Sequence, residues 1–268
     1  MTGAASGIGR HLCGALLREG DVVAAADLDA SCLARVSEED RWPEGRSELL
    51  AFDVRDPEAW ARTVETVLAR RGRLDLLLNV AGVLRPASVL DIQTADVDLQ
   101  IDVNLKGVIH GTRAAAARMK AGAGHIVNFA SLAALSPIPG LSLYTASKFA
   151  VRGFSLAAAH ELKPLGIAVT VICPDAVRTP MLDLQKAHPE AALTFSGAPL
   201  DVQDVAAALF RRVLPHRPLE VVLPFGRGLL AKLAGAFPRA GFALAPILVR
   251  KGLAAQQRHR TGGGKGLC

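Results

Sequence analysis

The chain has 268 residues, half of them apolar, which is enough for one large domain or one domain with an appendage. Four cysteines without paired spacing argue against a disulfide framework or zinc site, and seven scattered histidines indicate no metal ligands, so we expect a cytoplasmic protein without metal. The net charge of +6 arises after Glu220: no acidic residue follows it, and eight of the 31 basic residues lie within 221–268.

Apolar runs of strand length alternate with helical stretches along the chain. Strands are predicted at 21–26, 48–52, 74–78, 125–129, 167–173 and 219–223, and helices at 8–19, 57–71, 97–120, 142–165 and 202–213. This alternation predicts an α/β fold, a doubly wound parallel sheet with helices on both faces. Ligands of such sheets bind beyond the carboxyl ends of the strands.

A glycine-rich segment, Thr2-Gly3-Ala4-Ala5-Ser6-Gly7-Ile8-Gly9, precedes the first predicted helix. Glycines let a backbone approach a pyrophosphate, and a helix amino end supplies N–H groups and a positive dipole. Because the spacing Gly-x-x-x-Gly-x-Gly differs from Gly-x-Gly-x-x-Gly, an ordinary tight turn is nearly as good an interpretation of this segment alone.

Asp27 ends the strand that follows the first helix. A carboxylate there accepts hydrogen bonds from an adenosine ribose and repels a 2′-phosphate, so it favours NAD over NADP. The alternative role for Asp27 is to cap the following helical segment, although Asp29 is also placed to do this.

Tyr144 is the only tyrosine of the chain, and Lys148 stands four residues after it. Side chains at i and i+4 share one face of a helix, so the ammonium can lie beside the phenol. Lowering a phenol pKa from about 10 to about 7 takes roughly 4 kcal/mol, and a neighbouring cation in a dry cleft supplies part of it. The pair indicates proton transfer to or from an alcohol oxygen, although taken alone it also fits an ordinary half-buried tyrosine.

Together with these features, further motifs make the chain resemble the short-chain dehydrogenase/reductase family over residues 2–224. The matching segments are 2–9, Asp53-Val54, Asn79-Val80-Ala81-Gly82, Asn104, Ser131, Tyr144 with Lys148, and Pro174 through Thr179-Pro180. The resemblance implies a Rossmann-like sheet, a nicotinamide cofactor and an Asn-Ser-Tyr-Lys tetrad. It also implies a homodimer or homotetramer formed by the helices that begin near Asn104 and Tyr144.

The resemblance assigns roles to the four residues of the tetrad. Tyr144 is implied to be the general acid/base, and Lys148 to lower its pKa and contact the nicotinamide ribose. Ser131 is implied to hold and polarise the substrate oxygen, and Asn104 to position a water that relays protons through Lys148. The implied cofactor contacts are Tyr144 and Lys148 themselves, Gly3, Ser6, Gly7, Ile8, Gly9 and Asp27, then Asp53 and Val54 at the adenine, Asn79, Ala81 and Gly82 beneath the cofactor, and Pro174, Val177 and Thr179, the last two at the carboxamide.

Two departures from the family affect the predicted domain itself. The family has a central strand of about six apolar residues before the glycine loop, whereas Met1 alone precedes Thr2 here. We therefore expect an unfilled slot with unpaired backbone groups, a true start upstream of Met1, and weak or absent activity if the short chain is real. Asp175 stands where the family usually has glycine, which brings a charge near the nicotinamide.

The third departure is the segment 225–268, which we predict to be a basic amphipathic C-terminal extension of a 1–224 catalytic domain, with a disordered end at Gly262-Gly263-Gly264. Its apolar residues favour a helical pair that packs over the substrate cleft or a neighbouring subunit. The alternative is peripheral contact with an anionic membrane through 225–260. Prolines and charges argue against a spanning helix, and nucleic-acid binding is not expected because no aromatic residue interleaves with the terminal cations.

Apolar segments flank the predicted site at 132–135, 137–141 and 180–199. They indicate a hydrophobic secondary alcohol or ketone as substrate. The sequence thus predicts an NAD(P)-dependent oxidoreductase acting on CH–OH groups. The alternatives are an N-terminally truncated or non-catalytic cofactor-binding protein of the same fold, and a dehydratase or epimerase that uses the same proton-transfer group.

Overall fold

The computed structural model describes residues 1–120 and 122–260, with side chains described up to Arg258. Its strands all pair in parallel and are β1 (Val23–Asp27), β2 (Ser47–Ala51), β3 (Leu76–Asn79), β4 (His125–Phe129), β5 (Ala168–Pro174) and β6 (Glu220–Leu223). The predicted α/β fold is confirmed. The predicted disordered end lies outside the described residues.

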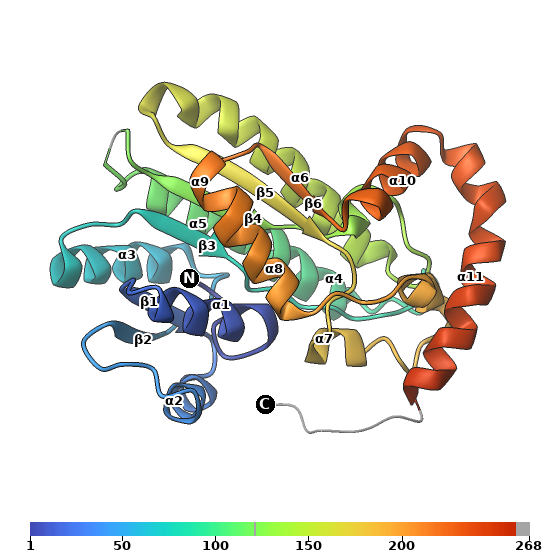
Figure 1. The fold of residues 1–268 in the computed structure, drawn as a ribbon, viewed down its shortest axis with the longest axis horizontal. Coiled ribbons are helices and arrows are strands. Elements are labelled where there is room, and N and C mark those ends of the chain that lie inside the picture. The colour runs from blue at the N-terminus through green and yellow to red at the C-terminus, as the bar shows by residue number, and fades with distance from the viewer. Residues whose placement is uncertain (121, 261–268) are drawn as a thin grey trace.

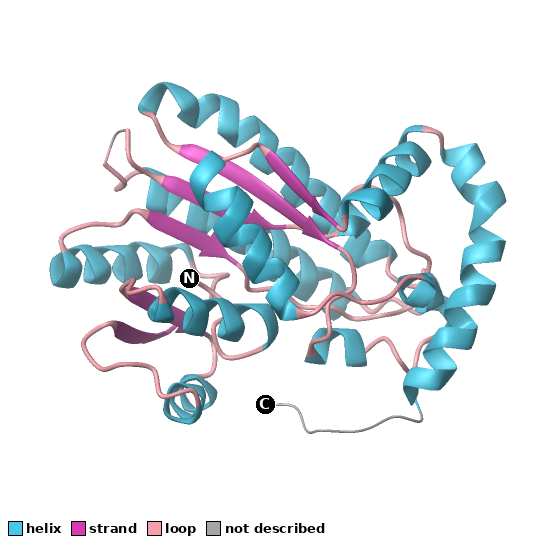
Figure 2. Cartoon of the chain, in the orientation of Figure 1, coloured by secondary structure: helices cyan, strands magenta, loops and turns pink. Residues whose placement is uncertain are grey.

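Helices cover both faces of the sheet (Figure 1). On one face α1 (Gly7–Arg18) packs against α8 (Val202–Ala208), and on the other lie α3 (Pro57–Arg71), α5 (Gly107–Ala116) and α6 (Ser142–Leu162). The largest apolar cluster lies beneath α1 and α8, where Leu12 and Leu209 are fully buried. Three shorter helices, drawn in cyan with the others in Figure 2, are α4 (Thr94–Ile101), α7 (Pro180–Asp183) and α9 (Leu214–His216).

The observed helices differ from the predicted ones in two respects. The single helix expected at 97–120 is divided into α4 and α5 by a π-helical turn, Asp102–Lys106. A further helix, α2 (Ala30–Glu39), lies between β1 and β2, and the Asp29 carboxylate caps it by accepting hydrogen bonds from Ser31 N (2.9 Å) and Cys32 N (3.0 Å). Asp29 therefore takes the capping role that was the alternative for Asp27.

The sheet is divided between β1 and β3, as the sequence predicted. β1 pairs with β2 in one sheet, and β3 to β6 form another in the order β3-β4-β5-β6. A cavity of about 630 Å³ separates the two sheets and is lined by Val23 and Ala24 of β1 and by Leu76 and Leu78 of β3. The predicted slot is therefore present between the facing edges of β1 and β3.

Residues at the start of the chain join the two sheets at one end of this slot. Ala26 N donates to Met1 O (2.8 Å), and Thr2 N donates to Leu78 O (3.1 Å). The buried Thr2 hydroxyl accepts hydrogen bonds from Val80 N (3.2 Å) and Ala81 N (3.3 Å). These contacts fix the glycine loop against the carboxyl ends of both β1 and β3.

A pair of helices, α10 (Phe225–Ala236) and α11 (Pro238–Arg260), forms an arm at one end of the molecule (Figure 1). We call residues 225–260 the C-terminal arm. α11 packs on the 3-10 segment Pro189–Ser196, and the buried Gln256 amide donates to Gln185 O and His188 O (2.8 Å each). Among the described residues, no helix has both the length and the apolar character needed to cross a membrane.

Candidate active site

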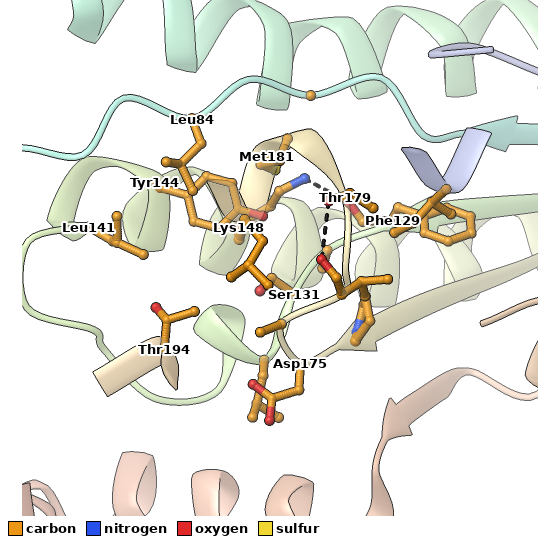
Figure 3. A pocket seen from close by; sticks show the side chains of 18 of the residues that line it. Leu84, Phe129, Ser131, Leu141, Tyr144, Lys148, Asp175, Thr179, Met181 and Thr194 are labelled. Carbon is orange, nitrogen blue, oxygen red and sulfur yellow. Dashed lines mark hydrogen bonds between the residues drawn. The ribbon is translucent and has the colours of Figure 1, made fainter. Parts of the chain in front are cut away.

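Ser131, Tyr144 and Lys148 meet at the carboxyl ends of β4 and β5 (Figure 3). Ser131 follows β4 by two residues, and α6 begins at Ser142, so Tyr144 and Lys148 lie in its first two turns. All three line a pocket with Pro174 at the end of β5, with Val177 and Thr179 from the segment after it, and with Ile8 at the start of α1. The structure therefore brings together three residues of the predicted tetrad and four of the predicted cofactor contacts.

Ser131 and Tyr144 are linked through their side chains. The Ser131 hydroxyl oxygen accepts a hydrogen bond from Ala133 N (3.2 Å) in the 3-10 turn Leu132–Ala134, which leaves its proton available for another oxygen. Burial raises the pKa of the Tyr144 phenol to about 12, and its hydrogen bond with Ser131 opposes that rise. Tyr144 is therefore protonated at neutral pH and can donate a proton.

Lys148 is buried beside the tyrosine. Its Nζ donates to Phe129 O (2.9 Å) and lies 5.6 Å from the centroid of the Tyr144 ring. Burial lowers the pKa of Lys148 to about 8. Burial of the phenol is the largest influence on the pKa of Tyr144 in this structure, and a lowering of that pKa by Lys148 stays a prediction.

Asn104 lies in the π-helical turn and is fully buried. Its Oδ1 accepts from Val83 N (2.8 Å), and its Nδ2 donates to Val83 O (2.9 Å) and to the Ser147 hydroxyl (3.1 Å), which in turn donates to Tyr144 O (2.7 Å). Asn104 thus ties the loop after β3 to α6. A Cβ added at Gly82 would lie 3.3 Å from Asn104 Oδ1 and 3.6 Å from Lys148 Nζ, so glycine leaves the space between them. The water relay stays a prediction.

The glycine loop is packed too closely for larger residues. Gly3 has a φ of +70°, and a Cβ there would lie 2.9 Å from Ala81 Cα. A Cβ at Gly9 would lie 1.8 Å from Gly3 O, so a side chain at this position would displace the loop. A Cβ at Gly7 would lie 3.2 Å from Thr179 Cγ2, which places the start of α1 beside Thr179. Ser6 precedes this helix as its exposed N-cap residue. The loop and the helix amino end fit a phosphate group.

The residues predicted for the adenosine end lie near the ends of β1 and β2. The Asp27 carboxylate accepts from Ala5 N (2.9 Å) and Leu28 N (2.8 Å), so it is fixed to the glycine loop. Asp53 forms an ion pair with Arg55 (2.6 Å), and this pair holds the pKa of the carboxyl below its usual range. The carbonyl of Val54 accepts a hydrogen bond from Trp60 Nε1 (3.0 Å).

The motif after β3 divides between the sheet and the pocket. Asn79 is buried, and its Nδ2 donates to Asn128 Oδ1 (2.9 Å), which links β3 to β4. Ala81 contacts Thr2 through its backbone, while Val80 and Gly82 line the pocket. The side chain of Asn79 therefore stabilises the sheet rather than facing the pocket.

Asp175 has a partner that the sequence did not indicate. Its side chain is 8% exposed and forms an ion pair with Arg227 of α10. The Arg227 guanidinium also donates to the Ser196 hydroxyl (3.4 Å). The charge expected near the nicotinamide is therefore compensated by the C-terminal arm. Across the described residues, no group of three or more potential metal-ligating side chains is present.

Comparison with known proteins identifies the class to which this site belongs. Residues 1–190 match the family model described as short chain dehydrogenase. The chain is 36% identical over 201 residues to a cyclopentanol dehydrogenase from Comamonas sp. (strain NCIMB 9872), covering 75% of this chain and 80% of the relative. It is 34% identical over 212 residues to a 3-alpha-(or 20-beta)-hydroxysteroid dehydrogenase from Mycobacterium tuberculosis (strain ATCC 25618 / H37Rv), covering 78% and 80% of the two chains.

Solved structures agree with this class. A short chain dehydrogenase/reductase from Burkholderia phymatum, in complex with NAD, superposes with a TM-score of 0.79 and 26% identity over 90% of this chain and 93% of that chain. Another short chain dehydrogenase of similar fold is in complex with NADP. The chain belongs to the short-chain dehydrogenase/reductase family. It is an oxidoreductase of the kind that acts on CH–OH groups with a nicotinamide cofactor.

Three contributors to the site were missed from the sequence. Phe129 acts through its backbone carbonyl, which carries no sequence signal. Ser147 lies three residues after Tyr144, on the same side of α6, and this spacing was an available signal. Arg227 forms an ion pair with the buried Asp175. Because a buried carboxylate needs a partner, the unusual Asp175 after Pro174 was an available signal for a nearby cation.

Proposed function

We propose that the protein interconverts a hydrophobic secondary alcohol and its ketone, using NAD, with Tyr144 as the proton donor and acceptor. The observation that supports this most directly is the meeting of Ser131, Tyr144 and Lys148 in a pocket whose other lining is largely apolar. Its apolar side chains include Leu84, Leu132, Ile138, Leu141, Met181 and Leu182. The two named relatives are dehydrogenases of a cyclic alcohol and of hydroxysteroids, which favours the same class of substrate.

The proton chemistry follows from the protonation states of the buried groups. In the direction of ketone reduction, protonated Tyr144 donates its proton to the carbonyl oxygen, while the Ser131 hydroxyl donates a hydrogen bond to the same oxygen. Lys148, whose pKa of about 8 keeps it mainly protonated at neutral pH, stabilises the phenolate that forms. When bound, the nicotinamide supplies or accepts the hydride.

Features of the glycine loop support binding of the cofactor. Close packing at Gly3 and Gly9 holds the loop at the start of α1, where helix N–H groups would meet a pyrophosphate. Asp27 lies where an adenosine ribose is recognised, which supports NAD in preference to NADP. Val177 and Thr179 lie beside the start of α1 and line the pocket, consistent with contacts at the nicotinamide end.

The test is a panel of hydrophobic secondary alcohols assayed for NADH formation, with Tyr144→Phe as the variant. We expect turnover of at least one alcohol by the unmodified chain and a loss of roughly 10²–10⁴-fold in the variant, because the proton donor is removed while the ring is kept. NADH binding, followed by fluorescence, should remain within a few-fold.

Two outcomes of this assay contradict the proposal. Turnover in Tyr144→Phe within tenfold of the unmodified chain excludes Tyr144 as the proton donor. NADH binding without turnover of any alcohol or ketone supports instead the non-catalytic, cofactor-binding alternative.

Assembly and domain organisation are proposed on the same family basis. We propose a cytoplasmic homodimer or homotetramer that uses the helices carrying Asn104 and Tyr144, and Phe149, 42% exposed on α6, is placed to contribute to such an interface. Residues 1–224 would form the catalytic domain and residues 225–268 its extension. Sedimentation equilibrium measures the assembly, and a monomer at every concentration would exclude it.

A further inference from the structure

The two sides of the C-terminal arm are chemically different. Its inner side is anchored: Gln256 is buried and bonded to two backbone carbonyls, Arg227 pairs with Asp175, and a Cβ at Gly252 would lie 1.9 Å from Ala192 O. The arm also carries nine of the 18 exposed large apolar side chains in the described part of the chain. The arm therefore carries half of the exposed large apolar side chains in about a seventh of the residues.

These apolar side chains follow the helix period. Phe225, Leu229 and Leu233 recur every fourth residue and so form one continuous stripe on α10. Phe237 follows at the turn between the helices, and Phe242 and Ile247 are each at least 67% exposed on α11. An apolar surface of this extent on a soluble fold marks a binding surface for another molecule.

The charge of the arm indicates which kind of molecule binds this surface. Arg239, Arg250 and Lys251 are exposed on α11, among the apolar side chains. No acidic residue follows Glu220 in the chain, whereas the part before the arm has 23 basic against 25 acidic residues. A second copy of the arm would oppose these cations with identical cations across a two-fold interface, which is unfavourable. An anionic surface with an apolar interior is complementary to both features.

We propose that the C-terminal arm binds the surface of an anionic phospholipid bilayer. Phe and Leu side chains on one side of a helix enter the boundary between headgroups and acyl chains, and Lys and Arg contact the phosphates. Among the described residues no helix can cross a membrane, so the contact is peripheral. The apolar side chains and the cations act together, since neither alone gives stable binding to a bilayer.

The position of the arm relates this surface to the pocket. We call residues 180–199, which include α7 and the 3-10 segment Pro189–Ser196, the lid. α11 packs on that 3-10 segment, and Gln256 donates to the backbone carbonyls of Gln185 and His188 in the lid. Met181, Gln185 and Thr194 of the lid line the pocket. A bilayer on the outer side of the arm would therefore lie beside the lid, where a hydrophobic substrate dissolved in the membrane enters. This last step rests on the proposed function, whereas the membrane contact does not.

The experiment is co-sedimentation of the full chain with vesicles of phosphatidylcholine alone and of phosphatidylcholine mixed with phosphatidylglycerol. We expect partition into the anionic vesicles to be at least about tenfold greater, because each cation near the surface favours binding. Phe237→Ser with Phe242→Ser, and separately Arg250→Gln with Lys251→Gln, should each reduce it about tenfold or more. Val89→Ser with Leu90→Ser, at an exposed apolar site outside the arm, is the matched control and should not change it.

Circular dichroism and NADH binding show whether each variant is folded, and vesicle binding is measured without turnover, so the result is independent of the proposed activity. Equal binding to both kinds of vesicle, or binding to neither, would overturn the proposal. So would a change of oligomeric state in Phe237→Ser with Phe242→Ser without a change in vesicle binding, because this outcome identifies a second copy as the occupant.

Discussion

The two parts of the sheet are held in different ways. β3 to β6 form an uninterrupted parallel ladder, and α6, which carries Tyr144 and Lys148, packs directly on β5. β1 and β2 form a pair of their own, joined to the ladder at one end by Met1 and Thr2. The residues proposed for proton transfer thus belong to the continuous part of the fold, whereas Asp27 and the glycine loop belong to the part that is separated from it by the slot.

This difference shows how the two tasks of the site depend on the fold. The positions of the proposed catalytic side chains are set by buried hydrogen bonds within one layer, such as those of Asn104 with Val83 and Ser147. The distance between that layer and the adenosine end is set by the few backbone contacts of residues 1–4. Changes in the ladder should therefore affect turnover, and changes in the bridge should affect stability and cofactor binding.

The largest expected effect on turnover is that of Lys148→Met. This change removes the buried cation from α6, which packs on the continuous β3 to β6 sheet, and keeps the length of the side chain. Turnover should fall by about 10²–10⁴-fold, because the phenolate loses its counter-charge. In the unmodified chain, ketone reduction should slow as pH rises through about 8, where Lys148 loses its proton, and this limb of the pH–rate profile should be absent from the variant.

Stability should change with pH in the opposite direction to the rate of ketone reduction. The unfolded chain keeps the proton on Lys148 up to its ordinary pKa of 10.5, whereas the folded chain releases it near 8, so the contribution of Lys148 to stability rises with pH across that window. Lys106→Met, at an exposed lysine paired with Asp102 (2.7 Å), is the control and should leave turnover and the profile unchanged. An unaltered limb near pH 8 in Lys148→Met would assign that limb to another group.

Thr2→Val weakens the bridge between the two sheets. Its hydroxyl accepts hydrogen bonds from Val80 N and Ala81 N, and the valine leaves these donors without a partner. We expect the free energy of unfolding in urea to fall by about 1–3 kcal/mol. Thr66→Val removes an exposed hydroxyl that donates to Arg62 O (2.8 Å) on α3, and its effect should stay within about 0.5 kcal/mol. Equal losses in the two variants would show that the bridge has no special role.

The smallest effect is expected from Asp27→Asn, on the cofactor side. The amide oxygen still accepts a hydrogen bond from Ala5 N, so the loop is kept while the charge that repels a 2′-phosphate is removed. The ratio of kcat/KM for NAD to that for NADP should fall by about tenfold, a free-energy change of about 1.4 kcal/mol. Asp29→Asn removes a charge two residues away, at the cap of α2, and should leave the ratio unchanged. The same change in both variants would remove Asp27 as the selecting residue.

Much of the fold was predictable because buried parallel strands are continuous apolar runs with clear boundaries. The observed strands differ from the predicted ones by two residues or fewer at each end, and α3 begins at Pro57 and ends at Arg71 as predicted. The π-helical turn at Asp102–Lys106 was not predictable, because the bonds of the Asn104 amide to residues distant in sequence fix that part of the helix. α2 was not predicted, although Asp29 was considered as a helix cap at its start.

Residue types at the site were predictable, but their electrostatic states were not. Spacing placed Lys148 beside Tyr144 and the resemblance added Ser131, yet the rise in the pKa of Tyr144 follows from burial by the surrounding chain, which neither describes. The same holds for Lys148, whose bond to Phe129 O depends on the end of β4. The resemblance supplied the roles, while the geometry supplied the protonation states.

The ion pair of Arg227 with Asp175 makes the C-terminal arm part of the active-site scaffold, although its composition differs from that of the preceding chain. Exchanging the arm for one from a relative without a matching arginine would leave a carboxylate buried beside the pocket without a counter-charge, at a cost of about 3–5 kcal/mol. The two positions are therefore expected to vary together among proteins of this design. The arm is not a transplantable module unless residue 175 is changed with it.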